Sequence, residues 1–115
     1  MAKYTKQETY KIADEIWQQL GAQRFSLVTG CKPIVYGEAN GMVYLLMSVG
    51  KNSHAINRFE ISYNQGLDLY EVRFLRKRGI ENHVVAQYKE VYADNLHMLF
   101  TQHTGMVTTF PRMAV

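Results

Sequence analysis

The chain has little cysteine and no long apolar run. Its single cysteine, Cys31, cannot form a disulfide within the chain, which excludes small disulfide-stabilised scaffolds. The longest apolar run, residues 42–47, is far shorter than the ~20 residues that a helix needs to cross a membrane. No apolar stretch near Met1 has the character of a signal peptide. We therefore expect a protein of a reducing cytoplasm that does not enter a membrane.

The composition is that of an ordinary globular domain. Hydrophobic residues make up 47% of the 115 residues and charged residues 20%. These values exclude a collagen-like chain, a coiled-coil rod and wholesale disorder. Because the length suits one domain with its own core, we expect residues 1–115 to form a single domain.

The N-terminal segment predicts a helix followed by a strand. Thr5 and Glu8 have the spacing of a capping box, and apolar residues then recur every three or four positions up to Gly21, a typical C-terminal cap. This pattern predicts a helix over residues 6–20. From Arg24 onward the apolar residues alternate instead, which predicts a strand over residues 24–29.

Two β-hairpins are predicted next. Asn40-Gly41 favours a tight turn, because both of its positions adopt positive φ readily. Asn64-Gln65-Gly66 predicts a second turn. The strands expected around these turns cover residues 34–36, 42–48, 59–63 and 68–75. In the last strand, alternation directs Tyr70, Val72 and Phe74 to the core and Glu71 and Arg73 to solvent.

The C-terminal part predicts a second helix. Residues 81–89 suit either a fifth strand or the start of that helix. From about Glu90, the apolar spacing predicts a helix with Tyr92 and His103 on its stripe, which Thr104-Gly105 ends. Residues 106–110 form a short β-prone tail. One core is expected to contain Trp17, Phe25, Leu27, Leu96, Leu99 and Phe100.

The order of these elements predicts the fold class. Strands that follow one another without helical crossovers pair antiparallel. We therefore expect an α+β domain with a mostly antiparallel sheet of four to five strands. The N-terminal and C-terminal helices would pack on one face, leaving the other face free.

The positive charge is concentrated in one segment. The chain has 13 Lys and Arg against 10 Asp and Glu, and four of the 13 are Arg73, Arg76, Lys77 and Arg78. We interpret this basic segment as the end of a strand, with Arg73, that runs into a charged turn from Arg76 to Gly79 able to hold phosphates. Lys32 is an additional nucleic-acid-binding residue, and Lys51 is a further candidate. Tyr63 and Tyr70 would stack on bases if they faced outward. Alternatively, the charges only keep a sheet edge in solution.

The eight tyrosines indicate a different kind of binding surface. So small a core cannot bury all of Tyr4, Tyr36, Tyr44 and Tyr88 with their hydroxyl groups hydrogen-bonded. An exposed tyrosine-rich sheet face would suit a protein partner. The alternative is that tyrosine serves only its ordinary preference for strands.

Metal binding and catalysis have weak sequence support. His97 and His103 are six residues apart and point about 120° away from each other on a helix, whereas helical zinc pairs are four apart. Cys31 precedes Lys32, yet no base is placed beside it, and the segment lacks the phosphate-loop pattern. We therefore expect no catalytic residue, no metal site and no cofactor.

Three short motifs occur together in this order: Gln19-Leu20-Gly21 with Phe25 and Thr29-Gly30-Cys31-Lys32, then the strand from Asp68 to Phe74, then the segment from Val91 to Gly105. In this the chain resembles a group of small uncharacterised proteins of bacterial phages and prophages. Cys31 stands where the group usually has alanine. The resemblance implies a phage origin and the cytoplasm of a bacterial host, and it implies no functional residue.

Together these features predict a small non-enzymatic phage or prophage protein that acts by binding. The leading hypothesis is a nucleic-acid-associated accessory protein that uses the basic segment. The alternative is a protein-binding inhibitor or adaptor, for example against a host defence complex, that uses the tyrosine-rich face. A host or phage protein is then the partner, and a homo-oligomer is compatible with either hypothesis.

Overall fold

The chain begins with the predicted helix in the computed structural model, which describes residues 3–108. Helix α1 (Lys6–Leu20) starts at a capping box: Thr5 Oγ1 accepts a hydrogen bond from the Glu8 amide, and the Glu8 carboxylate accepts one from the Thr5 amide. It ends at Gly21, whose φ of 113° few other residues tolerate. The predicted helix over residues 6–20 is therefore confirmed.

The strand predicted over residues 24–29 is wrong, because this segment forms a second helix, α2 (Ala22–Thr29). Phe25 and Thr29 lie one helical turn apart and are buried, while Leu27 is 69% exposed. Side chains two positions apart on a helix point in directions that differ by about 200°. Leu27 therefore points away from the core that Phe25 enters. The alternation in the sequence therefore reflects buried Phe25 and exposed Leu27 on a short helix.

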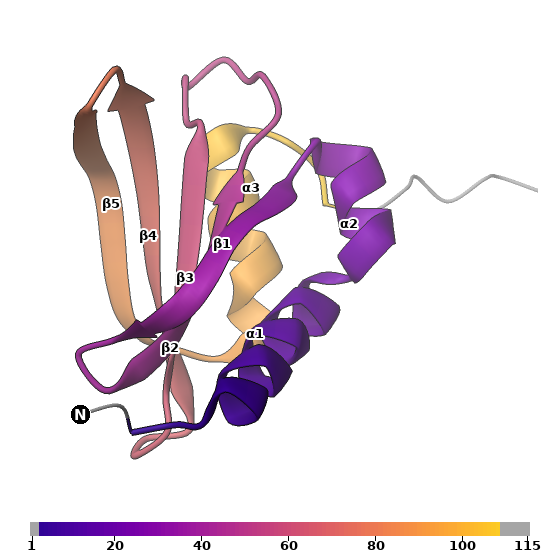
Figure 1. Ribbon diagram of the computed structural model, residues 1–115. Helices are drawn as coiled ribbons and strands as arrows, with labels where there is room; N and C mark the ends of the chain where they lie inside the picture. The colour runs from indigo at the N-terminus through magenta and orange to yellow at the C-terminus, as the bar shows by residue number, and fades with distance from the viewer. Residues whose placement is uncertain (1–2, 109–115) are drawn as a thin grey trace, which may run out of the picture.

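The strands form one antiparallel sheet (Figure 1). Its five strands, in both chain and spatial order, are β1 (Lys32–Ala39), β2 (Met42–Ser48), β3 (Arg58–Asn64), β4 (Leu69–Arg78) and β5 (Glu81–Val91). The turn at Asn40 and Gly41 is confirmed, with φ of 55° and 76°. Residues 81–89, which the sequence left open, belong to a strand. The predicted α+β class with an antiparallel sheet is confirmed.

The C-terminal helix begins later than the sequence predicts. A short 3₁₀ turn, η1 (Ala93–Asn95), leads into α3 (Leu96–Thr104), and Gly105 ends it with φ 76°. Tyr92 precedes η1 and α3 and is 63% exposed, so the prediction that it lies on the apolar stripe of the helix is wrong. Residues 106–108 form no strand, and the rest of the predicted β-prone tail lies outside the described residues. Within residues 3–108, no helix has the length and apolar character to cross a membrane.

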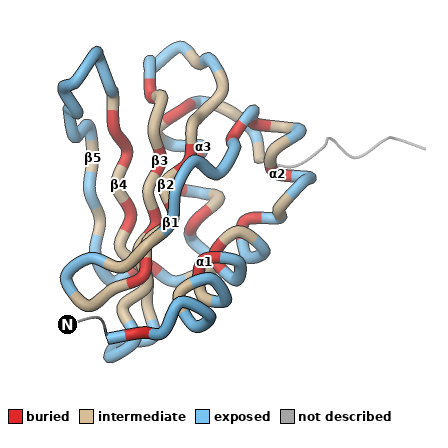
Figure 2. Tube along the Cα trace, viewed as in Figure 1, coloured by how far each residue is buried: buried red, intermediate tan, exposed pale blue. Residues whose placement is uncertain are grey.

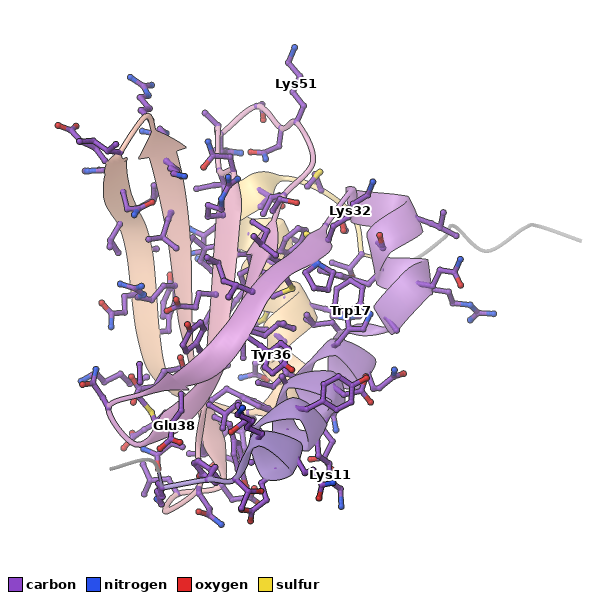
Figure 3. All side chains as sticks on the ribbon, in the orientation of Figure 1. Lys11, Trp17, Lys32, Tyr36, Glu38 and Lys51 are labelled. Atoms are coloured by element: carbon purple, nitrogen blue, oxygen red, sulfur yellow. The ribbon has the colours of Figure 1, made fainter. Side chains whose placement is uncertain are left out.

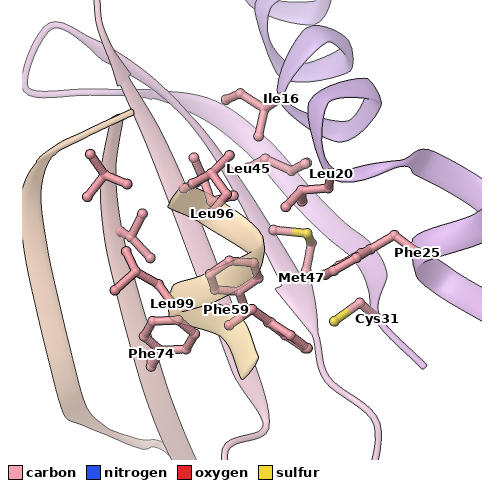
Figure 4. Packing of buried hydrophobic residues seen from close by; sticks show 14 of the residues in the cluster. Ile16, Leu20, Phe25, Cys31, Leu45, Met47, Phe59, Phe74, Leu96 and Leu99 are labelled. Carbon is pink, nitrogen blue, oxygen red and sulfur yellow. The ribbon is translucent and has the colours of Figure 1, made fainter. Parts of the chain in front are cut away.

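The helices cover one face of the sheet, and the core lies between the two layers (Figures 1 and 2). The rings of Phe25 and Phe100 meet edge to face, with their centroids 5.1 Å apart, and the centroids of Phe100 and Phe59 are 5.2 Å apart. Phe59 in turn stacks on Phe74 at 4.9 Å (Figure 4). The aromatic rings therefore connect α2, α3, β3 and β4. Of the predicted core, Phe25, Leu96, Leu99 and Phe100 are buried, Trp17 is half-buried and Leu27 is outside it.

The two buried helix ends share one local design. Thr29 donates its hydroxyl to the Phe25 carbonyl at 2.6 Å and accepts from the Cys31 amide at 3.1 Å. Thr104 repeats this with the Phe100 carbonyl at 2.7 Å and the Met106 amide at 3.1 Å. Each threonine hydroxyl thus bonds both to the carbonyl one turn earlier and to the amide two residues later, which ties the departing chain to the end of its helix. The recurrent Phe-x-x-x-Thr-Gly pattern is therefore a buried ring followed by a capped helix end.

Truncating Phe100 to alanine tests the helix–sheet core. Because its ring contacts Phe25 and Phe59, Phe100→Ala should lower the free energy of unfolding by about 3–5 kcal/mol. The control Leu27→Ala removes an exposed side chain and should change it by no more than about 0.5 kcal/mol. Urea denaturation followed by circular dichroism measures both. A loss below about 1 kcal/mol for Phe100→Ala would contradict the packing described.

Candidate functional site

Strand alternation divides the basic segment between the two faces of the sheet. Val72 and Phe74 are buried on the face that the helices cover, so Arg73 lies on the opposite face, which we call the open face. Lys77 lies on the open face with Arg73, while Arg76 and Arg78 lie on the helix side. Strand β4 continues through Arg78, so the predicted start of the turn at Arg76 is wrong: the turn begins at Gly79.

The strand register brings Lys32 to the same end of the sheet. Lys32 pairs with Ser48, Ser48 with Arg58, and Arg58 with Leu75, which makes one row across four strands. Lys77 lies two residues beyond Leu75. Lys51 lies in the loop of residues 49–57 beyond the ends of β2 and β3 (Figure 3).

These residues form a strongly cationic region, which we call the basic end. Of the 12 lysines and arginines within residues 3–108, six lie there: Lys32, Lys51, Arg58, Arg76, Lys77 and Arg78. In the same part of the chain, two carboxylates lie near them: Glu81 is in register with Arg78, and Glu60 lies two residues from Arg58 on the same face of β3. The opposite end of the sheet holds Glu38, Asp68 and Glu90, with Lys89 beside Glu90. The modest net charge of +3 is therefore concentrated at one end.

Backbone and side-chain contacts hold the basic end in place. Asn57 donates through its side chain to the Lys77 carbonyl at 2.9 Å and accepts from the Lys77 amide at 2.7 Å. Arg76 donates to the His54 carbonyl at 3.0 Å. Arg76 is thus tied to the loop, whereas Lys32, Lys77 and Arg78 are exposed and have no side-chain hydrogen bond within the described residues.

The loop that carries Lys51 is ordered by one asparagine. Asn52 donates to the carbonyls of Gly50 and Ile56 at 2.9 and 2.7 Å, and its side-chain oxygen accepts from the amides of His54 and Ile56 at 3.2 Å each. Next to it, Gly50 packs so closely that an added Cβ would lie 2.4 Å from the Thr29 carbonyl oxygen. The loop is therefore fixed against the α2–β1 connection.

An ion pair lies at the centre of the open face. Arg73 Nε donates to Glu60 Oε1 at 2.8 Å, across the β3–β4 register. The Glu60 side chain is 18% exposed and that of Arg73 is 37% exposed, so the pair is partly removed from water. Of the five predicted nucleic-acid-binding residues, Arg73 is therefore the one neutralised by a carboxylate.

The open face is hollowed on either side of this pair. The hollow next to the basic end has a volume of about 260 Å³ and is lined by Leu46, Leu75, Arg58, Lys77 and Asn82 among others. A second hollow of about 430 Å³ extends toward Met42 and Tyr44. Leu46, Glu60 and Arg73 border both, so the two hollows form one concave surface.

The tyrosines do not gather on the open face. Tyr63 pairs with Tyr70 and with buried Val43, which places both tyrosines on the helix side, where they cannot stack on a ligand of the open face. A hydrogen bond to Asp68 raises the pKa of Tyr63 to about 12, with burial adding to it. Tyr36 contacts Tyr10 of α1 at 5.8 Å. Tyr44 alone lines the open face within residues 3–108, so the predicted tyrosine-rich face does not form there.

The two histidines of α3 serve packing. His97 stacks on Phe25 and donates from Nε2 to the Leu20 carbonyl at 2.6 Å. His103 Nε2 shares a 2.6 Å hydrogen bond with the Tyr88 hydroxyl; burial, together with the charge of His54, lowers the pKa of His103. In the part of the chain that the structure describes, no three His, Cys, Asp or Glu side chains converge as metal ligands.

Cys31 lies in the core. It is fully buried, and this desolvation raises the pKa of its thiol to about 11. A thiol with this pKa is almost wholly protonated near neutral pH, and the thiolate is the nucleophilic form. Cys31 therefore packs as a small apolar side chain.

Comparisons with protein-family models, with curated proteins and with solved structures found no match for this chain. The resemblance to small phage proteins stays a prediction.

The burial of the Cys31 thiol leads to two testable predictions. At pH 8, native protein should react with a disulfide reagent about 100-fold more slowly than protein unfolded in guanidinium, because the raised pKa lowers the thiolate fraction. The raised folded-state pKa also means that Cys31 stabilises the fold below pH 9.0 and loses this contribution as pH rises toward about 11.

The variant Cys31→Ala isolates the second effect. The difference in unfolding free energy between wild type and variant should shrink from pH 9 to pH 11, whereas tyrosine and lysine titrations affect both proteins equally. Equal reaction rates for native and unfolded wild type would contradict the buried position of the thiol.

Proposed function

We propose that this protein is a non-enzymatic accessory protein of a phage or prophage that binds nucleic acid, and that the basic end holds the phosphate backbone. The observation that carries the proposal is the collection of six cations at one end of the sheet, near two carboxylates, Glu81 and Glu60, of which Glu60 is paired with Arg73. Phosphates are bound by several cations that project into solvent. Lys32, Lys51, Lys77 and Arg78 are all exposed.

Binding is favoured over catalysis by the state of the reactive side chains. Cys31 is buried and protonated, and His97 and His103 are engaged with the Leu20 carbonyl and Tyr88. The basic end also holds His54, whose Nδ1 lies 3.4 Å from the Ser53 hydroxyl, and His83, in register with Arg76, but within residues 3–108 no carboxylate is hydrogen-bonded to His54 to orient it as a base. Such a set suits electrostatic attraction and does not form the paired acid and base that group transfer needs.

The competing hypothesis of a protein-binding adaptor depended on a tyrosine-rich sheet face. Since Tyr44 alone lines that face within residues 3–108, no particular observation favours the adaptor. It is the interpretation that replaces ours if the nucleic-acid test fails.

The test compares two triple variants with the same charge change. Lys32→Ala, Lys77→Ala and Arg78→Ala together remove three exposed cations of the basic end and leave Arg73 and Arg76, which have partners in the fold. The control removes three exposed cations of the helices: Lys6→Ala, Lys11→Ala and Arg24→Ala. Binding of labelled DNA and RNA oligonucleotides is titrated at two salt concentrations.

We expect the basic-end variant to bind more weakly and with a flatter salt dependence. Each cation that neutralises a phosphate contributes about 0.7–0.9 to the slope of log affinity against log salt, so its removal should reduce the slope by that amount. The helix variant should keep most of the wild-type slope. No binding by wild type at about 50 mM salt would overturn the proposal. An equal weakening in the two variants would show that net charge, and not the basic end, causes the binding.

A further inference from the structure

We infer that the nucleic acid bound at the basic end is single-stranded and that an unpaired base sits in the 260 Å³ hollow of the open face. The inference rests on the proposed function and specifies its ligand. It comes from the position of this hollow, which lies on the open face directly beside the basic end.

The cations and the hollow share residues. Arg58 and Lys77 belong to the basic end and also line the hollow, and Lys32 stands in the same row as Arg58. From β1 to β4 this row spans three strand spacings, ~14 Å. A sugar-phosphate backbone that crosses the strands along this row has its bases directed along the strands, into the hollow.

The hollow offers the surfaces that a base needs. Leu46 and the exposed Ile34 provide apolar contact for the face of a base. The guanidinium of Arg73 is planar and held by Glu60 at 2.8 Å, which suits stacking against a base. Asn82 and Glu60 present amide and carboxylate groups that can bond to the edge of a base.

The charges arrange the ligand in one orientation. Within the hollow Glu60 pairs with Arg73, so the cations that remain to attract a phosphate are Arg58 and Lys77, which the hollow shares with the basic end. A phosphate is therefore attracted most strongly to Lys32, Arg58 and Lys77, while an uncharged base is not repelled by Glu60. In a duplex the bases are stacked and paired, so a concave surface of this kind admits bases of unpaired strands only.

The experiment uses a strand, its duplex and an abasic strand of equal length that keeps the phosphates and lacks the bases. Wild type should bind the strand about tenfold more tightly than either the duplex or the abasic strand. Leu46→Ala removes apolar contact in the hollow without changing charge. It should weaken binding of the normal strand several-fold and leave the abasic strand unaffected.

The matched control is Met42→Ala, on the same strand and the same face but in the other hollow. It should bind the normal strand as wild type does. If strand, duplex and abasic strand bind alike, the base site is overturned while the basic end stands. If none of them binds, the proposed function falls as well. If polyglutamate binds as tightly as the strand at equal salt, an acidic protein segment replaces the nucleic acid as the partner.

Discussion

The contact between Phe100 and Phe59 joins the two layers of this domain. Phe100 brings α3 onto the sheet, and its other neighbour, Phe25, brings α2 to the same point. The sheet is a simple meander whose strands pair only with their chain neighbours, so its ladder hydrogen bonds do not define which face is covered. That choice follows from where the large rings are buried. A free open face, and hence every surface available for binding, is a consequence of this one-sided core.

Local patterns predicted most of the elements because their causes are local. The capping residues Thr5 and Glu8 and the Asn40-Gly41 turn act within a few residues. Helix α2 was missed because a helix of two turns with one exposed leucine has the same alternation as a strand. β5 could not be assigned from the sequence because its pairing with β4 includes two register shifts that interrupt its alternation.

The candidate site could be predicted only in part, because its residues come together only through the pairing register of the strands. The segment from Arg73 to Arg78 is visible in the sequence, but its division between the two faces follows from β4 continuing as a strand. Arg58 was missed because nothing near it in the sequence is basic; it joins Lys32 only through the β1–β2–β3 pairing. The hollow depends on the same pairing, since Leu46 and Leu75 come from strands that are not neighbours in the sheet.

The close approach of Gly30 and Gly50 has a consequence for the thermodynamics of recognition. An added Cβ on Gly30 would lie 2.9 Å from the Gly50 Cα, so the two connections have room for glycine alone. Together with the four hydrogen bonds of Asn52, this fixes the loop of residues 49–57 before any ligand arrives. A surface loop that is already ordered loses little conformational entropy on association. The loop that carries Lys51 is thus preorganised, which favours binding of a ligand without a change in the loop's conformation.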